Sequence, residues 1–319
     1  MNAEISLVYS SENIITGNAM NGSEVLLDKW STHNLIVDNR IVNSPSEGIY
    51  TQGLSSDNVI AGNTIINSSS IWGGIFIDSS GNTITDNNII SNYVSISLQS
   101  SGNKIYHNNF INNTSPVWCI SVGNVWDNDY PSGGNYWSDY TGVDLHSGPF
   151  QNETGSDGIG DASYTAWNIE DYCPLVAPIT DFDAGFWNGE TFNVDVVSNS
   201  TVLDFYFNPE EGAFLKFNVT GGNETFGFCR VAIPKDLLWV DDGWTVLYGS
   251  YSLNYKTFPD ENYTYLYFTY TNPSQNGFTT VTINGTNAIP EFSSFIILPL
   301  FMIATLLAVI IYKRKHQTL

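Results

Sequence analysis

The sequence contains few charged residues, and very few of them are basic. Its 319 residues include 10 Lys and Arg against 32 Asp and Glu, which gives a formal net charge of −22, and charged residues make up only 13% of the chain. So acidic a chain repels phosphate backbones, and we therefore expect no nucleic acid among its partners. Solubility outside a cell and binding of cations are two explanations of the charge, and the sequence leaves both open.

Cysteine, methionine and histidine are scarce as well. The three cysteines fit no zinc spacing, and one disulfide could form, for which Cys119 and Cys173 are the best pair. Copper sites use His, Met and Cys. The histidines and methionines do not cluster along the chain, so we expect no copper site; they are His33, His107, His146, His316, Met1, Met20 and Met302.

A repeat dominates the first 110 residues. The segments "NIITGN", "NLIVDN", "NVIAGN", "NTITDN" and "NKIYHN" follow one another at steps of 21 or 24 residues. Each has Asn at its first and sixth positions and Ile at its third. The first column is Asn13, Asn34, Asn58, Asn82 and Asn103, and the Ile column is Ile15, Ile36, Ile60, Ile84 and Ile105.

This period, with short β-rich segments between Gly, Asn and Ser, predicts a parallel β-helix over residues 1–125. The Ile column should stack inside, and the Asn residues should form hydrogen-bonded ladders at corners, where Asn tolerates the left-handed conformation. Trp126 and Trp137 should cover the end of the helix. Further inward candidates are Leu27, Ile49, Ile75, Ile77, Ile96 and Leu98.

A segment rich in Trp, Gly and Asp follows the repeats, at residues 126–178. It contains "GGNYWSDYTG" at 133–142, "DGIGD" at 157–161 and "DYCPL" at 171–175. With these motifs the chain resembles the NosD-like, CASH-type right-handed parallel β-helix repeat proteins, in particular archaeal surface members with a C-terminal membrane anchor. The resemblance implies that this segment connects and caps the β-helix and that a further domain follows.

The "DGIGD" motif also looks like part of a calcium loop. Calcium takes six to eight oxygen ligands. Asp157 and Asp161 would supply two of them, and Asp139, Asp144 or Glu170 would complete the site. The alternative is a turn in which the Asp side chains accept hydrogen bonds from backbone amides.

Short alternating strands at residues 179–287 predict an immunoglobulin-like β-sandwich. A linker at 288–294 leads to the apolar run "FIILPLFMIATLLAVIIY" at 295–312, which is long enough to span a membrane, and a basic tail at 313–319. The predicted fold is therefore all-β: a right-handed parallel β-helix, then an immunoglobulin-like β-sandwich, then one C-terminal transmembrane helix. It places the protein in the cell membrane as a single-pass protein, with a cytoplasmic C-terminus and the bulk outside.

The other end lacks an export signal. Residues 1–13 contain no apolar signal-peptide core and enter a β-helix coil at once, so we expect the sequence to lack its true N-terminus. Frequent Asn-x-Ser/Thr sequons agree with a glycosylated outer surface. The candidate acceptors are Asn21, Asn67, Asn112, Asn113, Asn152, Asn199, Asn218, Asn223, Asn262 and Asn284.

The sequence shows no catalytic constellation. Asp38 and Asp86 fall in one column, ~9.6 Å apart by coil spacing, a separation that suits an inverting glycosidase, but two structural corner residues explain them more simply. Tyr50 and Trp72 are the candidates for carbohydrate contact. We expect a non-catalytic surface protein whose partners are the membrane and surface polysaccharide or other envelope proteins. The alternative is a remnant of a polysaccharide lyase or glycoside hydrolase.

Overall fold

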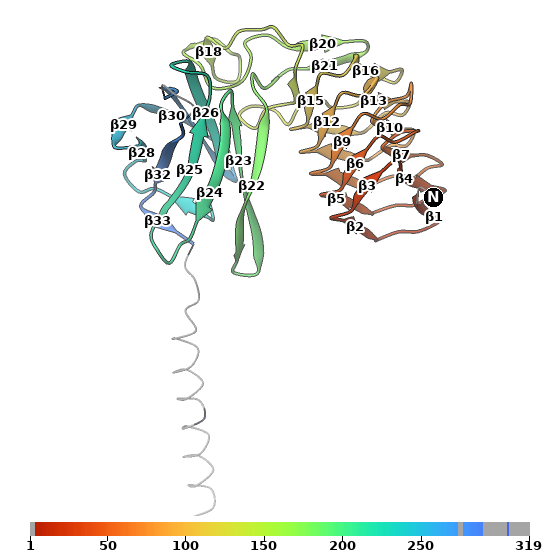
Figure 1. Ribbon diagram of the computed structural model, residues 1–319, viewed down its shortest axis with the longest axis horizontal. Helices are drawn as coiled ribbons and strands as arrows, with labels where there is room; N and C mark the ends of the chain where they lie inside the picture. Colours follow the sequence, from red (N-terminus) through yellow and green to blue (C-terminus); the bar gives the residue numbers. More distant parts are fainter. Residues whose placement is uncertain (1–3, 274–276, 290–304, 306–319) are drawn as a thin grey trace, which may run out of the picture.

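The structure is a computed structural model that describes residues 4–273, 277–289 and 305. Two β domains stand side by side and are joined across one end by irregular loops (Figure 1). The described residues form short parallel strands in the first domain and longer antiparallel strands in the second. The predicted all-β fold with a parallel β-helix is confirmed.

The β-helix is built of three parallel sheets, and successive coils add one strand to each. The first sheet contains β1 (Ile5–Val8), β4 (Val25–Asp28), β7 (Ile49–Thr51), β10 (Ile75–Ile77), β13 (Val94–Leu98) and β16 (Ser115–Cys119). The second contains β2 (Ile14–Thr16), β5 (Leu35–Val37), β8 (Val59–Ala61), β11 (Thr83–Thr85) and β14 (Lys104–Tyr106). The third contains β3 (Ala19–Asn21), β6 (Arg40–Val42), β9 (Thr64–Ile66), β12 (Asn88–Ile90), β15 (Asn109–Ile111) and β17 (Tyr136–Trp137).

The repeat register predicted from the Ile column is the register of the second sheet. Ile84 pairs with Ile60 on one side and with Ile105 on the other, and all three are fully buried. In the first sheet Ile75 pairs with Ile96, as the 21-residue step predicts. The columns form one continuous apolar core, and its contribution to folding comes from burial of these stacked aliphatic side chains.

The Asn ladders are present, but the left-handed corners lie one residue earlier than expected. Asn39 Nδ2 donates to Asn63 Oδ1 at 3.0 Å and to the Val37 carbonyl oxygen at 3.0 Å. The positive φ angle belongs to Asp38, at 55°. The side-chain amide of each ladder Asn therefore holds the strand that follows in register, and the residue before the Asn makes the turn.

The β-helix ladder continues past residue 125 and ends in an aromatic plug. Val125 bridges to Lys104, and β17 pairs with β15. Trp137 is 1% exposed and stacks between Phe110 and Tyr164, at centroid distances of 4.2 and 4.4 Å. Trp126 is buried beside it. Both predicted tryptophans thus cover the end of the apolar core.

The plug is held by loops and short hairpins of the connector. These hairpins consist of β18 (His146–Ser147) with β19 (Glu153–Thr154) and β20 (Tyr164–Ala166) with β21 (Ile169–Asp171). The possible disulfide between Cys119 and Cys173 is not formed, because both thiols are free. Cys119 points into the β-helix, where its Sγ contacts the Ser121 carbonyl oxygen at 3.0 Å.

The second domain consists of two antiparallel sheets that enclose one apolar core. The inner sandwich sheet runs in the order β22 (Ile179–Trp187), β23 (Glu190–Ser198), β26 (Phe226–Pro234), β31 (Tyr263–Thr271) and β30 (Tyr255–Pro259). The outer sandwich sheet runs in the order β24 (Thr201–Phe207), β25 (Phe214–Thr220), β32 (Thr279–Asn284), β28 (Thr245–Tyr248) and β29 (Tyr251–Leu253). A short pair, β27 (Leu238–Trp239) and β33 (Asn287–Ala288), closes one end.

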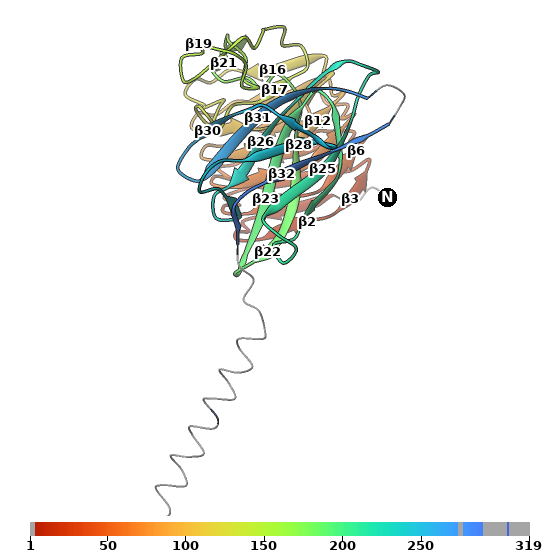
Figure 2. The ribbon, with the colours of Figure 1, turned by 90° about the vertical axis from the view of Figure 1, so that its left-hand side faces the viewer.

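The inner sandwich sheet packs against the β-helix (Figures 1 and 2). Asn109 of β15 exchanges two hydrogen bonds with the backbone of Ile179 in β22, at 2.7 and 2.9 Å. The buried Arg230 of β26 donates to the Pro131 carbonyl oxygen of the connector. A small apolar cluster that includes Ile159 and Phe228 fills the space between these contacts. The two domains therefore meet over a specific junction.

In the part of the chain that the structure describes, no helix has the length and apolar character needed to cross a membrane. The predicted span at 295–312 lies outside the described residues, except for Thr305.

Candidate functional site

One corner of the β-helix carries polar residues toward the sandwich. Four residues after the first ladder Asn, the successive coils have Gly17, Asp38, Gly62, Asp86 and His107, and all five have positive φ angles of 55° to 67°. Gly, Asn, Asp and His adopt this conformation more readily than bulkier residues. The sequence thus presents Asp86 and His107 as neighbours on consecutive coils.

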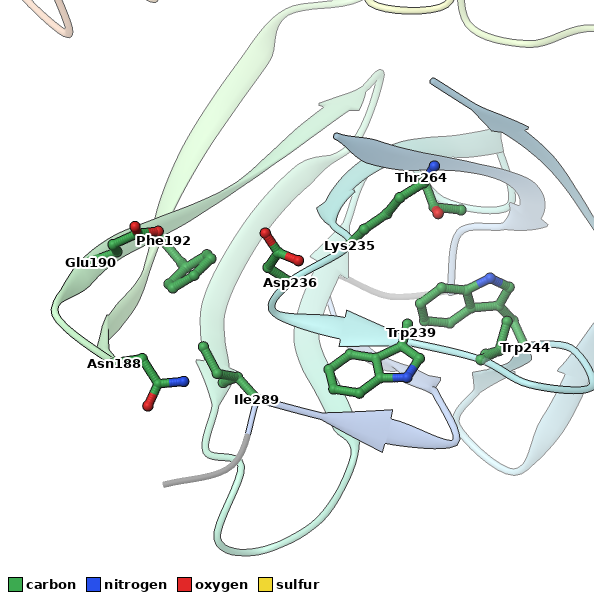
Figure 3. A pocket seen from close by; sticks show the side chains of 10 residues that line it. Asn188, Glu190, Phe192, Lys235, Asp236, Trp239, Trp244, Thr264 and Ile289 are labelled. Carbon is green, nitrogen blue, oxygen red and sulfur yellow. The ribbon is translucent and has the colours of Figure 1, made fainter. Parts of the chain in front are cut away.

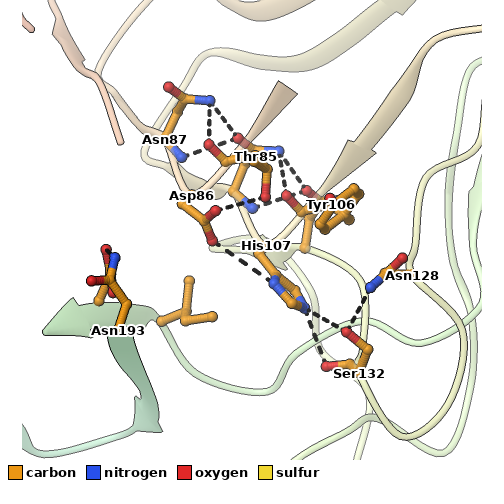
Figure 4. A network of polar contacts seen from close by, with 12 residues as sticks. Thr85, Asp86, Asn87, Tyr106, His107, Asn128, Ser132 and Asn193 are labelled. Atoms are coloured by element: carbon orange, nitrogen blue, oxygen red, sulfur yellow. Dashed lines mark hydrogen bonds and ion pairs between the residues drawn. The ribbon is translucent and has the colours of Figure 1, made fainter. Parts of the chain in front are cut away.

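The side chains of Asp86 and His107 lie next to each other (Figure 4). Asp195 of β23, in the inner sandwich sheet, lies close to both. One ligand atom of each of the three side chains lies within 4.8 Å of the others. His107 Nδ1 is 3.8 Å from Asp86 Oδ1, and its Nε2 is 3.2 Å from both the carbonyl oxygen and Oγ of Ser132. Two domains thus contribute to one polar cluster, which we call the junction cluster.

A third aspartate and a cavity extend the junction cluster. Asp181 of β22 pairs directly across the strands with Asp195, and its carboxylate accepts a hydrogen bond from Asn193 Nδ2 at 2.8 Å. A cavity of about 310 Å³ opens beside the cluster. It is lined by Asp86, Tyr106, His107, Asn128, Ser132, Asp195, Ala232, Asp260, Asn262, Tyr263 and Tyr265.

Burial dominates the electrostatics of the junction cluster. It raises the pKa of Asp86 to about 6 and, together with the negative charge of Asp86, raises the pKa of Asp195 well above its ordinary value. Burial lowers the pKa of His107 to about 4, and Arg230 contributes in the same direction. The imidazole is therefore neutral near pH 7, which is the form that binds metals.

The residues predicted to bind calcium lie in the connector and accept hydrogen bonds from protein groups. Asp144 accepts from the amides of Asp157 and Gly158, at 3.0 and 2.8 Å. Asp157 Oδ1 accepts from the Ile159 amide at 3.0 Å. These contacts match the turn that the sequence offers as the alternative to calcium.

The other three acidic residues of the calcium prediction also accept hydrogen bonds from protein groups. Asp161 accepts from two backbone amides and lies 2.7 Å from His146 Nδ1. Asp139 accepts from the Tyr164 hydroxyl at 3.1 Å. Glu170 Oε1 accepts from Ser163 Oγ at 2.9 Å. Calcium binding at these residues stays a prediction.

Tyr50 and Trp72, predicted to contact carbohydrate, belong to a row of aromatic rings on the outer face of the first sheet. Tyr50 packs edge-on against Phe76 at 4.8 Å, Phe76 against Trp72 at 5.8 Å, and Trp72 stacks on Trp118 at 4.5 Å. Tyr50, Phe76 and Trp118 occupy one outward column of the strand register, and Trp72 fills the position above Ser97. We call this row the aromatic strip.

The first sheet, whose outer face carries the aromatic strip, lies on the side of the β-helix away from the sandwich (Figure 1). Phe76 is buried beneath its neighbours, whereas the other three rings are partly exposed. Beyond Trp118 the surface continues into a cavity of about 580 Å³ lined by Pro116, Tyr140, Tyr164, Trp167 and their neighbours. Trp167 is 70% exposed. Aromatic faces are therefore available over several coils.

The sandwich contains a separate cavity of about 700 Å³ (Figure 3). Phe192, Trp239 and Ile289 line its apolar side, and Lys235 and Asp236 line its polar side. Lys235 Nζ is already engaged by the Asp260 carbonyl oxygen. The cavity lies at the end of the sandwich that β27 and β33 close, and none of its lining residues belongs to the junction cluster or to the aromatic strip.

Asp38 and Asp86 share a column, as predicted, but face different partners. The position of a Cβ atom built on Gly62 lies 2.4 Å from Asp38 Oδ1, so the Asp38 carboxylate leans over the next coil.

Most of the predicted glycosylation sites are exposed. Asn113, Asn218 and Asn284 are partly buried, and Asn113 also accepts ladder hydrogen bonds from Asn92.

The junction cluster is the feature that the sequence analysis missed. The histidines are not close to one another along the chain, and the informative signal is the corner column, in which Asp86 and His107 are 21 residues apart. The repeat register places Asp86 and His107 next to each other. No sequence pattern places Asp195 beside them, because only the packing of the two domains brings it to the cluster.

Comparisons with known proteins agree with this architecture. Residues 2–142 match the family described as periplasmic copper-binding protein (NosD). Over this region the chain is similar to that family, and the structure shows it to be a parallel β-helix. Copper binding is stated in the family's description alone.

Two further comparisons were with curated proteins and with solved structures. No curated protein matches the chain. A solved structure of the phiAB6 tailspike, in complex with three-repeated oligosaccharides of Acinetobacter baumannii surface polysaccharide, aligns at 9% identity and a TM-score of 0.22. That alignment covers 88% of this chain and 70% of the tailspike chain.

Proposed function

We propose that this protein is a non-catalytic surface protein that contacts carbohydrate through the aromatic strip. The observation that supports this proposal is the unbroken contact of Tyr50, Phe76, Trp72 and Trp118 on an outer sheet face. Aromatic rings present large apolar faces at low entropic cost, and the apolar faces of sugar rings can stack on them. Strands spaced ~4.8 Å apart offer a repeating surface for a chain of sugars.

The charges around the strip select the kind of carbohydrate. Burial and the nearby carboxylates of Asp78, Glu47 and Asp28 raise the pKa of the Tyr50 hydroxyl. The chain as a whole carries a formal charge of −22. A polymer of uronic acids would be repelled by this surface. The proposed ligand is therefore a neutral or amino-bearing glycan.

The proposal also keeps the location expected from the sequence. The apolar run at 295–312 with its basic tail supports a single membrane span, and exposed sequons such as Asn67 and Asn152 support an outer, glycosylated surface. In this arrangement the first sheet, on the side away from the sandwich, presents the aromatic strip to the envelope.

A glycan array with the full chain tests the proposal. We expect binding to neutral or amino-bearing oligosaccharides and none to polygalacturonate. Trp118→Ala should weaken the binding about tenfold or more, because it removes one stacking face. Tyr251→Ala, which removes an exposed aromatic ring from the outer sandwich sheet, should leave binding unchanged. Binding that survives Trp118→Ala together with Trp72→Ala in a folded protein would contradict the proposal.

A further inference from the structure

We propose that the junction cluster binds one divalent first-row transition metal ion through Asp86, His107 and Asp195, and that this ion ties the β-helix to the sandwich. The three side chains come from two consecutive β-helix coils and from β23 of the sandwich, and one ligand atom of each lies within 4.8 Å of the others. Asp195 lies outside residues 2–142, so the site is not contained in the region that matches the NosD family.

The hydrogen bonds of His107 leave one ring nitrogen available to a metal. The Ser132 carbonyl oxygen, 3.2 Å from Nε2, accepts a hydrogen bond in the tautomer that carries its proton on Nε2, and Ser132 Oγ at the same distance can accept as well. In that tautomer Nδ1 holds a lone pair 3.8 Å from Asp86 Oδ1, a distance too long for a hydrogen bond. A metal ion between Nδ1 and the carboxylate would be bound by both groups and would select this tautomer. A carbonyl acceptor on the far nitrogen is also the usual support of a metal-bound histidine.

The carboxylates of the junction cluster also lack a compensating positive charge. Among the described residues, no lysine or arginine forms an ion pair with Asp86, Asp181 or Asp195. Asp181 and Asp195 are direct partners across the paired strands β22 and β23, so two carboxyl groups lie side by side next to Asp86. A divalent cation can compensate the negative charge of these groups.

The donor set and its spacing suit zinc or manganese. One imidazole nitrogen with two carboxylate oxygens is a known kind of zinc set, and calcium and magnesium prefer oxygen ligands alone. Two ligand atoms of a tetrahedral zinc ion lie about 3.3 Å apart, so small side-chain rotations close the site. The adjoining cavity of about 310 Å³ leaves room for water to complete the coordination.

Zinc binding by the full chain tests the inference. After removal of metals with EDTA, equilibrium dialysis against Zn²⁺ should give one tightly bound ion per chain. His107→Gln and Asp195→Asn should each weaken that binding by at least about tenfold. His33→Gln and His146→Gln, which change exposed or half-exposed histidines elsewhere, should leave it unchanged. Ca²⁺ and Mg²⁺ at the same concentration should not displace the zinc.

A second measurement keeps the test decisive if the variants fold poorly. In the wild-type chain, Co²⁺ should give the intense visible absorption of a tetrahedral site with nitrogen and oxygen ligands, and Zn²⁺ should displace it. The inference is overturned if the wild type takes up no zinc, if folded His107→Gln and Asp195→Asn chains keep full affinity, or if His146→Gln removes it. None of these results depends on carbohydrate binding.

Discussion

At the scale of single residues, the Asn ladders connect the coils as directly as the strands do. Asn87 is fully buried and donates from Nδ2 to Asn108 Oδ1, to Ile60 O and to Thr85 O, at 2.8 to 2.9 Å. Its own Oδ1 accepts from the amide and the side chain of Asn63. Each ladder Asn therefore satisfies backbone groups that water cannot reach.

We predict that Asn87→Ala lowers the free energy of unfolding by about 2–4 kcal/mol, because several buried polar groups lose their partners at once. Asn21→Ala, at an exposed position of β3, should change it by less than about 0.5 kcal/mol. Chemical denaturation of both variants measures the difference. Equal stability of the Asn87→Ala variant and the wild type would show that the ladder hydrogen bonds contribute nothing net.

At the scale of elements, the cap contains a buried carboxyl group that titrates near neutrality. Asp171 Oδ2 accepts from Trp137 Nε1 at 2.9 Å and from the Asn135 amide at 2.8 Å. Burial nevertheless raises the pKa of Asp171 to about 7, since the cost of desolvating the charge exceeds the gain from these donors. The folded state therefore binds this proton more tightly than the unfolded chain, whose Asp pKa is about 4.

The sign of the pH effect follows from that difference. The contribution of Asp171 is most stabilising below about pH 4, is lost as the pH rises from about 4 to about 7, and is constant above that range. We predict that the free energy of unfolding of the wild type, relative to Asp171→Asn, falls by on the order of 2–4 kcal/mol between pH 4.5 and 7.5. Denaturation series at several pH values measure it, and a constant difference would refute the assignment.

Some elements were predictable from the sequence and others were not, for physical reasons. The β-helix register follows from repetition, because Ile36, Ile60 and Ile84 each specify the same inward position. In the sandwich, β22 and β30 are harder to recognise as strands from the sequence. β22 contains Asp181 and Asp183, and aspartates are common in loops. β30 is only five residues long, so its alternating pattern is short.

The two candidate sites also differ in how far the sequence predicts them. Tyr50 and Trp72 were identified by their chemistry, and the structure adds Phe76 and Trp118, which the strand register places beside them. The junction cluster depends on the domain contact, and no pattern in residues 179–287 indicates that Asp195 faces the β-helix. Local periodicity thus predicts columns within a domain, whereas contacts between domains need the fold.

At the scale of the whole molecule, the two candidate sites lie on opposite sides of the β-helix. The junction cluster includes Asp195 of the inner sandwich sheet. The first sheet, which carries the aromatic strip, lies on the far side of the β-helix (Figure 1). This arrangement separates a joint that fixes the relative position of the domains from a surface that is open to a large ligand. A polymer bound along the strip would therefore meet no part of the sandwich.

Hydroxyl-radical footprinting of the full chain, with and without the strongest glycan from the array, tests the central claim most directly. The account predicts that the glycan protects Tyr50, Trp72 and Trp118 from oxidation and leaves Trp239, in the sandwich cavity, unchanged. Protection confined to Trp239 and Trp244, or equal oxidation of Trp72 and Trp118 with and without a bound glycan, would contradict it.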